Sequence, residues 1–173
     1  MESNNLVSAC CTGHRPQKFP FAYGGRGREY SAYLQELKNK IEAAVTERGV
    51  TRFISGMALG ADLDFAEIVL EFRKTKYPQI TLECAIPCPN QTEKWRIGEK
   101  HRYEKIKEQA DCVTVVSEYY TPECMLKRNR YMVDKSNLVI AVFNGIEKGG
   151  TWYTIRYARA KGVSVSVINL NEI

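Results

Sequence analysis

The sequence has no long apolar run and no recognisable leader. No stretch approaches the roughly 20 apolar residues that a membrane-spanning helix needs, and residues 1–5 lack the basic and apolar regions of a signal peptide. With 44% hydrophobic and 26% charged residues in a chain of 173, the composition is that of an ordinary globular protein. We therefore expect a cytoplasmic protein without a membrane partner, folded as a single domain over residues 1–173.

The six cysteines also lack the spacing of a metal site or a disulfide framework. Cys84 and Cys88 do not form a CxxC pair, and the adjacent Cys10 and Cys11 lie in a strand-like run that would point them to opposite faces. We expect reduced, mostly buried thiols and no bound metal. The basic residues are scattered rather than clustered, so the net charge of +5 is compatible with an anionic ligand or nucleic acid but identifies neither.

Six short apolar runs alternate with amphipathic stretches. The runs predict strands at residues 6–11, 51–55, 80–85, 112–116, 138–143 and 163–168. Helical spacing fills the intervals, for example over residues 30–45 before Gly49 and over residues 63–72 before Pro78. Strands separated by helices of this length favour right-handed crossovers, so the sequence predicts an α/β fold whose mostly parallel sheet carries helices on both faces.

Two common phosphate-binding fingerprints are missing from the loops of this predicted sheet. The absence of G-x-G-x-x-G and of G-x-x-x-x-G-K-[ST] argues against an ordinary Rossmann dehydrogenase and a P-loop NTPase. Two other glycine loops follow predicted strands, SGMALG at residues 55–60 and NGIEKGGT at residues 144–151. Each precedes a helical pattern and would deliver backbone N–H groups at a helix N-terminus, where phosphate is attracted. Two such loops can hold two ends of one phosphorylated ligand.

The two loops differ in their side chains. In the first, the Ser55 hydroxyl favours phosphate or ribose contact, although the loop can also be a plain tight connection. Asp62 in the following turn would repel phosphate, so it either caps its helix or contacts ribose hydroxyls or a base N–H. In the second loop, Gly149, Gly150 and Thr151 form the stronger anion site, with a plain turn as the alternative.

Further candidates lie at the predicted carboxyl ends of the strands, where open α/β sheets bind ligands. Arg15 can clamp phosphate or merely anchor its loop, and the neighbouring His14 can contact ligand or serve as a structural residue. Arg128, Asn129 and Met132 are spaced to share one face of a helix. Five aromatic residues follow strands or glycine loops, and one or two of them are expected to stack on a base: Trp95, Tyr119, Tyr120, Trp152 and Tyr153.

Four motifs together resemble a known family. Residues 12–18 (TGHRPQK), 55–62 (SGMALGAD), 128–134 (RNRYMVD) and 149–151 (GGT) are similar, in this order, to the YpsA/YoqJ-like proteins of bacilli and their phages. These proteins belong to the SLOG superfamily, which also holds the DprA and LOG-type proteins. The resemblance covers nearly the whole chain. It implies a Rossmann-like three-layer sandwich that binds a nucleotide or a nucleotide-derived molecule, a homodimer or higher homo-oligomer, and a phage or prophage origin.

Together the motifs and the resemblance predict a ligand-binding set with no catalytic residue, no metal ligand and no cofactor other than the nucleotide-derived ligand. The set comprises Gly13, His14, Arg15, Ser55, Gly56, Met57, Ala58, Gly60, Asp62, Pro87, Tyr119, Arg128, Asn129, Met132, Asn144, Gly145, Gly149, Gly150 and Thr151.

The residues after the second loop bear on catalysis. LOG-type phosphoribohydrolases carry a glutamate just after their glycine-threonine loop, whereas this chain has Trp152 and Tyr153 there. A neutral phenol cannot supply the negative charge that stabilises an oxocarbenium-like centre. We therefore expect a non-catalytic domain that senses or sequesters a phosphorylated nucleotide-derived molecule, such as an ADP-ribose or cyclic-nucleotide derivative.

Two alternative functions stay open at this stage. The first is an N-glycosidic hydrolase that uses Asp62, Asp64 or Glu118 as its carboxylate. The second is a DprA-like binder of single-stranded nucleic acid, which the charge of +5 and the loop aromatics permit but which is disfavoured because the sequence has no clustered basic stripe.

Overall fold

A six-stranded parallel sheet in the order β4-β3-β2-β1-β5-β6 forms the centre of the protein, as seen in a computed structural model that describes residues 6–173. The strands are β1 (Ser8–Gly13), β2 (Arg52–Ser55), β3 (Thr81–Ile86), β4 (Cys112–Val115), β5 (Leu138–Phe143) and β6 (Ser164–Asn169). All six predicted strands are confirmed. The first lies two residues later than predicted, because Thr12 and Gly13 pair with Ala141 and Val142 of β5.

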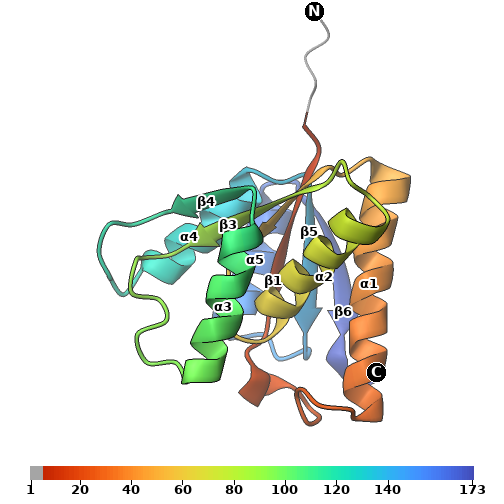
Figure 1. Cartoon of the computed structure of the whole chain (residues 1–173), viewed down its shortest axis with the longest axis horizontal. Coiled ribbons are helices and arrows are strands. Elements are labelled where there is room, and N and C mark those ends of the chain that lie inside the picture. Colours follow the sequence, from red (N-terminus) through yellow and green to blue (C-terminus); the bar gives the residue numbers. More distant parts are fainter. Residues whose placement is uncertain (1–5) are drawn as a thin grey trace, which may run out of the picture.

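Five helices cover the sheet in two layers. They are α1 (Arg28–Arg48), α2 (Ala61–Thr75), α3 (Ile97–Gln109), α4 (Cys124–Asp134) and α5 (Gly149–Ala160), with short 3-10 helices at Pro16–Lys18 and Leu170–Glu172. Helices α1, α2 and α3 lie on one face of the sheet, and α4 and α5 lie on the other (Figure 1). The predicted Rossmann-like three-layer α/β fold is confirmed.

Helix ends follow the local sequence. Helix α1 ends at Gly49, whose φ of 66° lies in the left-handed region that glycine adopts without steric cost. Helix α4 begins at Cys124, one turn before Arg128. Arg128 and Met132, four residues apart, therefore lie on the same face of the helix and are both buried.

Two apolar cores lie on opposite sides of the sheet. Cys11 packs with Tyr33 and Phe65 under α1 and α2, whereas Cys10 packs with Met132 under α4. The two adjacent cysteines thus face opposite layers, as their strand position predicts. All six thiols are free, and five of them are buried. None of the helices within residues 6–173 is long and apolar enough to cross a lipid bilayer.

Candidate functional site

The order in which strands are added to the sheet reverses at β1. From β1 the chain adds β2, β3 and β4 on one side, and later adds β5 and β6 on the other side. The connections that leave β1 and β5 therefore run to helices on opposite faces of the sheet (Figure 1). This switch point is where open α/β sheets bind their ligands.

A cavity of about 190 Å³ lies at this switch point. It is enclosed by the end of β1 and its following turn, by the start of α2, by one face of α4 and by the first turn of α5. The lining residues are Cys11, Thr12, Gly13, His14, Arg15, Lys18, Ala58, Asp62, Met125, Arg128, Asn129, Met132, Gly150 and Thr151.

The first turn of α5 presents unused hydrogen-bond donors to this cavity. The helix begins at Gly149, whose φ is 86°, and within the described chain no side chain caps it. Gly150 and Thr151 both line the cavity. An ideal Cβ at Gly149 would lie 3.2 Å from Lys18 Nζ, so an ammonium group stands beside the same helix end. Uncapped N–H groups at a helix N-terminus, with a nearby cation, attract an anion.

His14 adds a polar group that lacks a partner. Its side chain is 3% exposed, and its Nδ1 lies 3.3 Å from the Thr151 hydroxyl. Burial lowers the pKa of the imidazole below 6.5, so the ring is mostly neutral at pH 7. His14 Nε2 is buried and makes no well-formed hydrogen bond among residues 6–173, although the nearby Asn144 side chain interacts with the ring and opposes the effect of burial on its pKa. If Thr151 is assigned as the donor to Nδ1, the ring proton stands on Nε2, where a ligand oxygen can accept it.

Arg128 brings a buried positive charge to the opposite wall. Its side chain is 4% exposed, and its guanidinium donates to the Gly56 carbonyl and, from Nε, to Asn129 Oδ1 at 2.9 Å. A third contact runs from Nη2 to the Met125 sulfur at 3.8 Å. Burial lowers the pKa of Arg128, and the nearby Asp62 carboxylate opposes this effect. Arginine nevertheless stays protonated in proteins, so the cavity contains a fixed cation.

Asp62 is the carboxylate of this cavity. It is 5% exposed, and its Oδ2 accepts a hydrogen bond from the Ala58 amide at 3.2 Å. Burial raises the pKa of Asp62 to about 6, although Arg128 and Arg15 both favour its charged form. Gly56 lies between Asp62 and Arg128, because an ideal Cβ there would come within 2.9 Å of both side chains. Only glycine fits at this position.

The first glycine loop uses most of its polar groups internally. The Ser55 hydroxyl donates to the Asp62 carbonyl at 2.8 Å and accepts from the Met57 amide at 3.2 Å. At Gly60 an ideal Cβ would lie 2.4 Å from the His14 carbonyl, so this glycine lets the loop pack against the turn after β1. Ser55, Gly56, Met57 and Gly60 lie behind the cavity wall and do not line it.

The structure therefore brings together ten of the predicted contacts at one cavity. These are Gly13, His14, Arg15, Ala58, Asp62, Arg128, Asn129, Met132, Gly150 and Thr151. Five others, besides the four residues of the first glycine loop, lie outside its lining. Asn144 borders a neighbouring cavity with Lys148, next to Gly145; Pro87 is buried and bonds to Ser117; Tyr119 is 77% exposed; and Gly149 stands just before Gly150.

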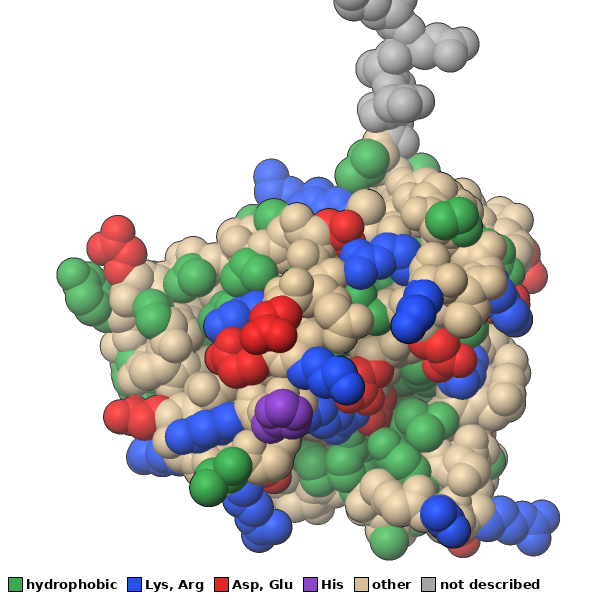
Figure 2. All heavy atoms as spheres, viewed as in Figure 1, with side chains coloured by type: hydrophobic (Ala, Val, Ile, Leu, Met, Phe, Trp, Pro, Cys, Tyr) green, Lys and Arg blue, Asp and Glu red, His purple; other side chains and the backbone are tan. Residues whose placement is uncertain are grey.

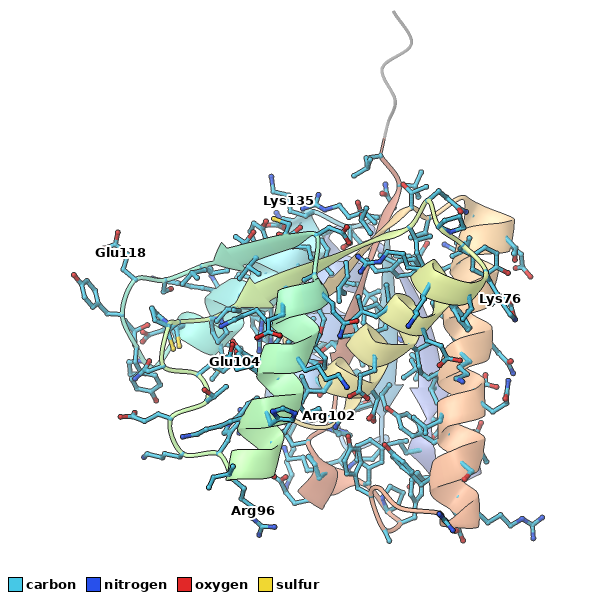
Figure 3. The ribbon with its side chains drawn as sticks, viewed as in Figure 1. Lys76, Arg96, Arg102, Glu104, Glu118 and Lys135 are labelled. Carbon is cyan, nitrogen blue, oxygen red and sulfur yellow. The ribbon has the colours of Figure 1, made fainter. Side chains whose placement is uncertain are left out.

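Sequence reasoning missed four lining residues, namely Cys11, Thr12, Lys18 and Met125. Thr12 and Lys18 belong to the TGHRPQK motif, which could have indicated them. Met125 carries no local signal, because its position depends on α4 beginning at Cys124. The alternative carboxylates lie elsewhere: Asp64 bonds to tyrosines and Arg102, and Glu118 is exposed on the connection after β4, as Figure 3 shows.

Two further cavities adjoin the first. One of about 510 Å³ shares Arg15 and Met125 with it, and one of about 400 Å³ shares His14 and Lys18. The carboxyl edge of the sheet thus carries three neighbouring hollows, the central one sharing lining residues with each of the others. A ligand larger than a single phosphate can extend from the central cavity in either direction.

The open parallel sheet defines a Rossmann-like α/β protein, with a cavity at the switch point where such sheets bind ligands. The chain belongs to the YspA SLOG family (YpsA), whose sequence model matches residues 9–172. This finding confirms the family that the four motifs indicate.

Individual relatives agree with this assignment. The chain is 33% identical to the SPbeta prophage-derived protein YoqJ of Bacillus subtilis (strain 168), over 73% of this chain and 82% of that protein. It is 32% identical to a UPF0398 protein of Bacillus thuringiensis (strain Al Hakam), over 73% of this chain and 68% of the relative.

A solved structure shares the fold. DNA processing protein A from Helicobacter pylori, described for its binding of single-stranded DNA, superposes with a TM-score of 0.59 at 19% identity. The match covers 93% of this chain but spans only 64% of the neighbour's length. At this identity the likeness supports the fold alone.

Proposed function

We propose that the cavity at the β1/β5 switch point binds a phosphorylated nucleotide-derived molecule and retains it without cleaving it. The observation that carries the proposal is the convergence of an uncapped α5 N-terminus, the unpartnered His14 Nε2 and the buried Arg128 on one cavity. Backbone N–H groups, an imidazole N–H and a guanidinium are all donors, so together they suit a phosphate or pyrophosphate. The family assignment and the fold likeness support a nucleotide or nucleic-acid ligand.

The proposed role is sensing or sequestration rather than hydrolysis. Trp152 and Tyr153 follow the phosphate-binding turn, so α5 offers no carboxylate near the ligand's sugar. Asp62 is the one carboxylate among the described residues that lines the cavity, and its Oδ2 is already bonded to the Ala58 amide. This bond and the neighbouring Arg128 suit a positioning role toward ribose hydroxyls. We infer the ligand class to be an ADP-ribose or cyclic-nucleotide derivative, and the protein to act as a homodimer or higher homo-oligomer.

Titration calorimetry with ADP-ribose, followed by chromatography of the ligand recovered after overnight incubation, tests this proposal. We expect saturable binding and recovery of unchanged ADP-ribose. Recovery of free adenine or ribose phosphate at an enzymatic rate, lost in Asp62→Asn, would replace the proposal with the hydrolase alternative, because the amide keeps the side-chain shape but removes the charge.

Binding of single-stranded nucleic acid is the second candidate, since the DprA neighbour binds single-stranded DNA and the three hollows adjoin one another. Against it, Lys and Arg side chains are interspersed with Asp and Glu on the face shown in Figure 2, so that face has no basic stripe. Fluorescence anisotropy with an oligothymidylate at two salt concentrations separates the candidates. Tight binding that falls steeply with salt and is insensitive to ADP-ribose would favour nucleic acid.

A further inference from the structure

The largest of the three hollows has a lining unlike that of the central cavity. It lies between the turn after β1, the connection from β3 to α3 and the start of α4, and its volume is about 510 Å³. Apolar and aromatic groups, including Leu59, Cys88 and Trp95, share its wall with the amide of Gln91. Arg15 and Met125 border both this hollow and the central cavity, so one ligand can occupy both.

Gln91 borders this hollow and carries an unpaired acceptor just behind its wall. Its Nε2 donates to the Gly56 carbonyl at 3.2 Å, the same carbonyl that accepts from Arg128. A carbonyl can only accept, so this contact fixes which end of the amide is the NH₂ group. The remaining Gln91 Oε1 is buried and accepts no hydrogen bond within the described chain. An unpaired buried acceptor destabilises the protein, and a ligand donor that reaches it removes this cost.

Trp95 supplies a flat apolar surface in the same hollow. Its ring is partly buried and packs edge-on against Tyr103, with 5.4 Å between the ring centroids, and Tyr103 is itself buried in the core. The indole is therefore held in place before any ligand arrives. A fixed aromatic ring beside a polar wall that includes Gln91, Asn90 and Glu93 suits a planar heterocycle with N–H donors at its edge.

We propose that this hollow is the nucleobase subsite, in which a base with an exocyclic amino group packs on Trp95 and donates to Gln91 Oε1. The inference rests on the proposed function, because the phosphate of the same ligand would occupy the central cavity at α5. It adds the chemical identity of the other end of the ligand. An amino base such as adenine fits, whereas its 6-oxo counterpart, hypoxanthine, would place a carbonyl oxygen against the Gln91 oxygen.

Calorimetry with three probes tests the subsite: ADP-ribose, its hypoxanthine analogue and ribose 5-phosphate, which has no base. The wild-type protein should bind ADP-ribose about tenfold more tightly than the hypoxanthine analogue, the scale of one hydrogen bond. In Gln91→Leu this preference should disappear, while ribose 5-phosphate binds as in the wild type. Gln35→Leu, the same change on the exposed face of α1, is the matched control and should keep the preference.

A second pair of variants tests the stacking surface. Trp95→Phe keeps a ring and should weaken ADP-ribose binding less than Trp95→Leu does, with ribose 5-phosphate unaffected by both. If the probes bind but Gln91→Leu leaves the adenine preference unchanged, or if the wild type has no preference, the base subsite is wrong and the phosphate site stands. If Gln91→Leu weakens ribose 5-phosphate equally, Gln91 acts only by supporting Gly56. If none of the probes binds the wild type, the proposed function itself fails.

Discussion

At Gly150 the side-chain hydrogen faces open space, and this makes the residue a clean probe of the phosphate site. The nearest atom to an ideal Cβ there is Asn129 Nδ2, at 4.0 Å. We predict that Gly150→Asp removes ADP-ribose binding and leaves the fold intact, because a carboxylate would stand where the ligand phosphate is expected. Calorimetry and circular dichroism measure the two effects. Unchanged affinity in a folded variant would move the anion site away from α5.

Arg15 is the accessible arginine of the cavity, and its removal should affect binding more than stability. We predict that Arg15→Ala costs about 1.5–3 kcal/mol of ADP-ribose binding, the range for hydrogen bonds to charged groups, and that Arg15→Lys restores part of it. Arg26→Ala removes the same charge from an exposed position before α1 and serves as the control. If Arg15→Ala and Arg26→Ala bind ADP-ribose with the same affinity at both low and high salt, Arg15 has only a structural role.

Asp62 should make binding depend on pH. Its pKa of about 6 lies above the usual 3.8, so the carboxylate is mostly charged at pH 7.5 and mostly protonated at pH 5. The folded state holds this proton more tightly than the unfolded state does. The free energy of unfolding therefore falls as the pH rises from 3.8 to about 6. For binding, protonation removes a negative charge from the cavity; the charged groups that act on Asp62 are Arg128, Arg15 and, from outside the cavity, Asp64.

We therefore predict that affinity for ADP-ribose, whose pyrophosphate keeps its charge over this range, rises on the order of tenfold from pH 7.5 to pH 5. Asp62→Asn should largely flatten this profile. The pKa of His14 is lowered, so its protonation adds in the same direction only toward the acid end. A profile that is flat in the wild type, or equally steep in Asp62→Asn, would mean that Asp62 does not control the charge of the site.

At the level of elements, Asp64 of α2 ties three helices to the connection after β1. Its carboxylate accepts from Tyr23 at 2.8 Å, Tyr30 at 3.0 Å and Tyr33 at 3.1 Å. Arg102 of α3, labelled in Figure 3, donates to this carboxylate at 2.7 Å and also pairs with Glu67. The residues that precede α1 include the turn with His14, Arg15 and Lys18, so this network helps to hold one wall of the site.

We predict that Asp64→Ala lowers the free energy of unfolding by about 3–5 kcal/mol, because it leaves Arg102 and three tyrosine hydroxyls without their shared partner. Glu67→Ala removes the exposed partner of the same arginine and should cost about 1 kcal/mol or less. Urea denaturation of both variants gives the comparison. Equal losses would show that burial of Asp64 contributes nothing beyond its ion pair with Arg102.

The elements themselves were predictable, because apolar runs of strand length and helical spacing are local properties of the sequence. The opposite faces of Cys10 and Cys11 and the shared face of Arg128 and Met132 follow from the same periodicities. The difference between the two glycine loops was not predictable. It arises because polar groups of the first loop bond to Asp62 and Arg128 instead of facing the cavity. The sequence alone shows neither the approach of Arg128 from a distant helix nor the roles of Ser55 and Asp62.

The same limit explains the residues that sequence reasoning missed. Gln91 and Met125 lie in segments without a motif, and both matter only through contacts with Gly56 and Arg128 on other elements. The bonding of Asp64 could not be predicted either, since its tyrosine partners are more than 30 positions away in the sequence. Side chains that meet only after the sheet has formed leave no local pattern.

At the scale of the whole molecule, the strand order places the three neighbouring hollows at the carboxyl edge of the sheet, with the phosphate-attracting turn of α5 beside the central one. We therefore expect one ligand that extends beyond the central cavity, carries its negative charge within that cavity and stays intact after binding. A small inorganic ion would not fill these hollows, and a split nucleotide would require chemistry for which the α5 turn supplies no carboxylate.

Native mass spectrometry of the protein purified from its host, compared with Gly150→Asp prepared in the same way, shows whether the cavity holds an intact ligand. We predict that the wild-type protein retains a non-covalent adduct whose released mass and absorbance identify an intact phosphorylated nucleotide derivative, and that the variant carries none. Release of a free base or a sugar phosphate, or an identical adduct on Gly150→Asp, would contradict it.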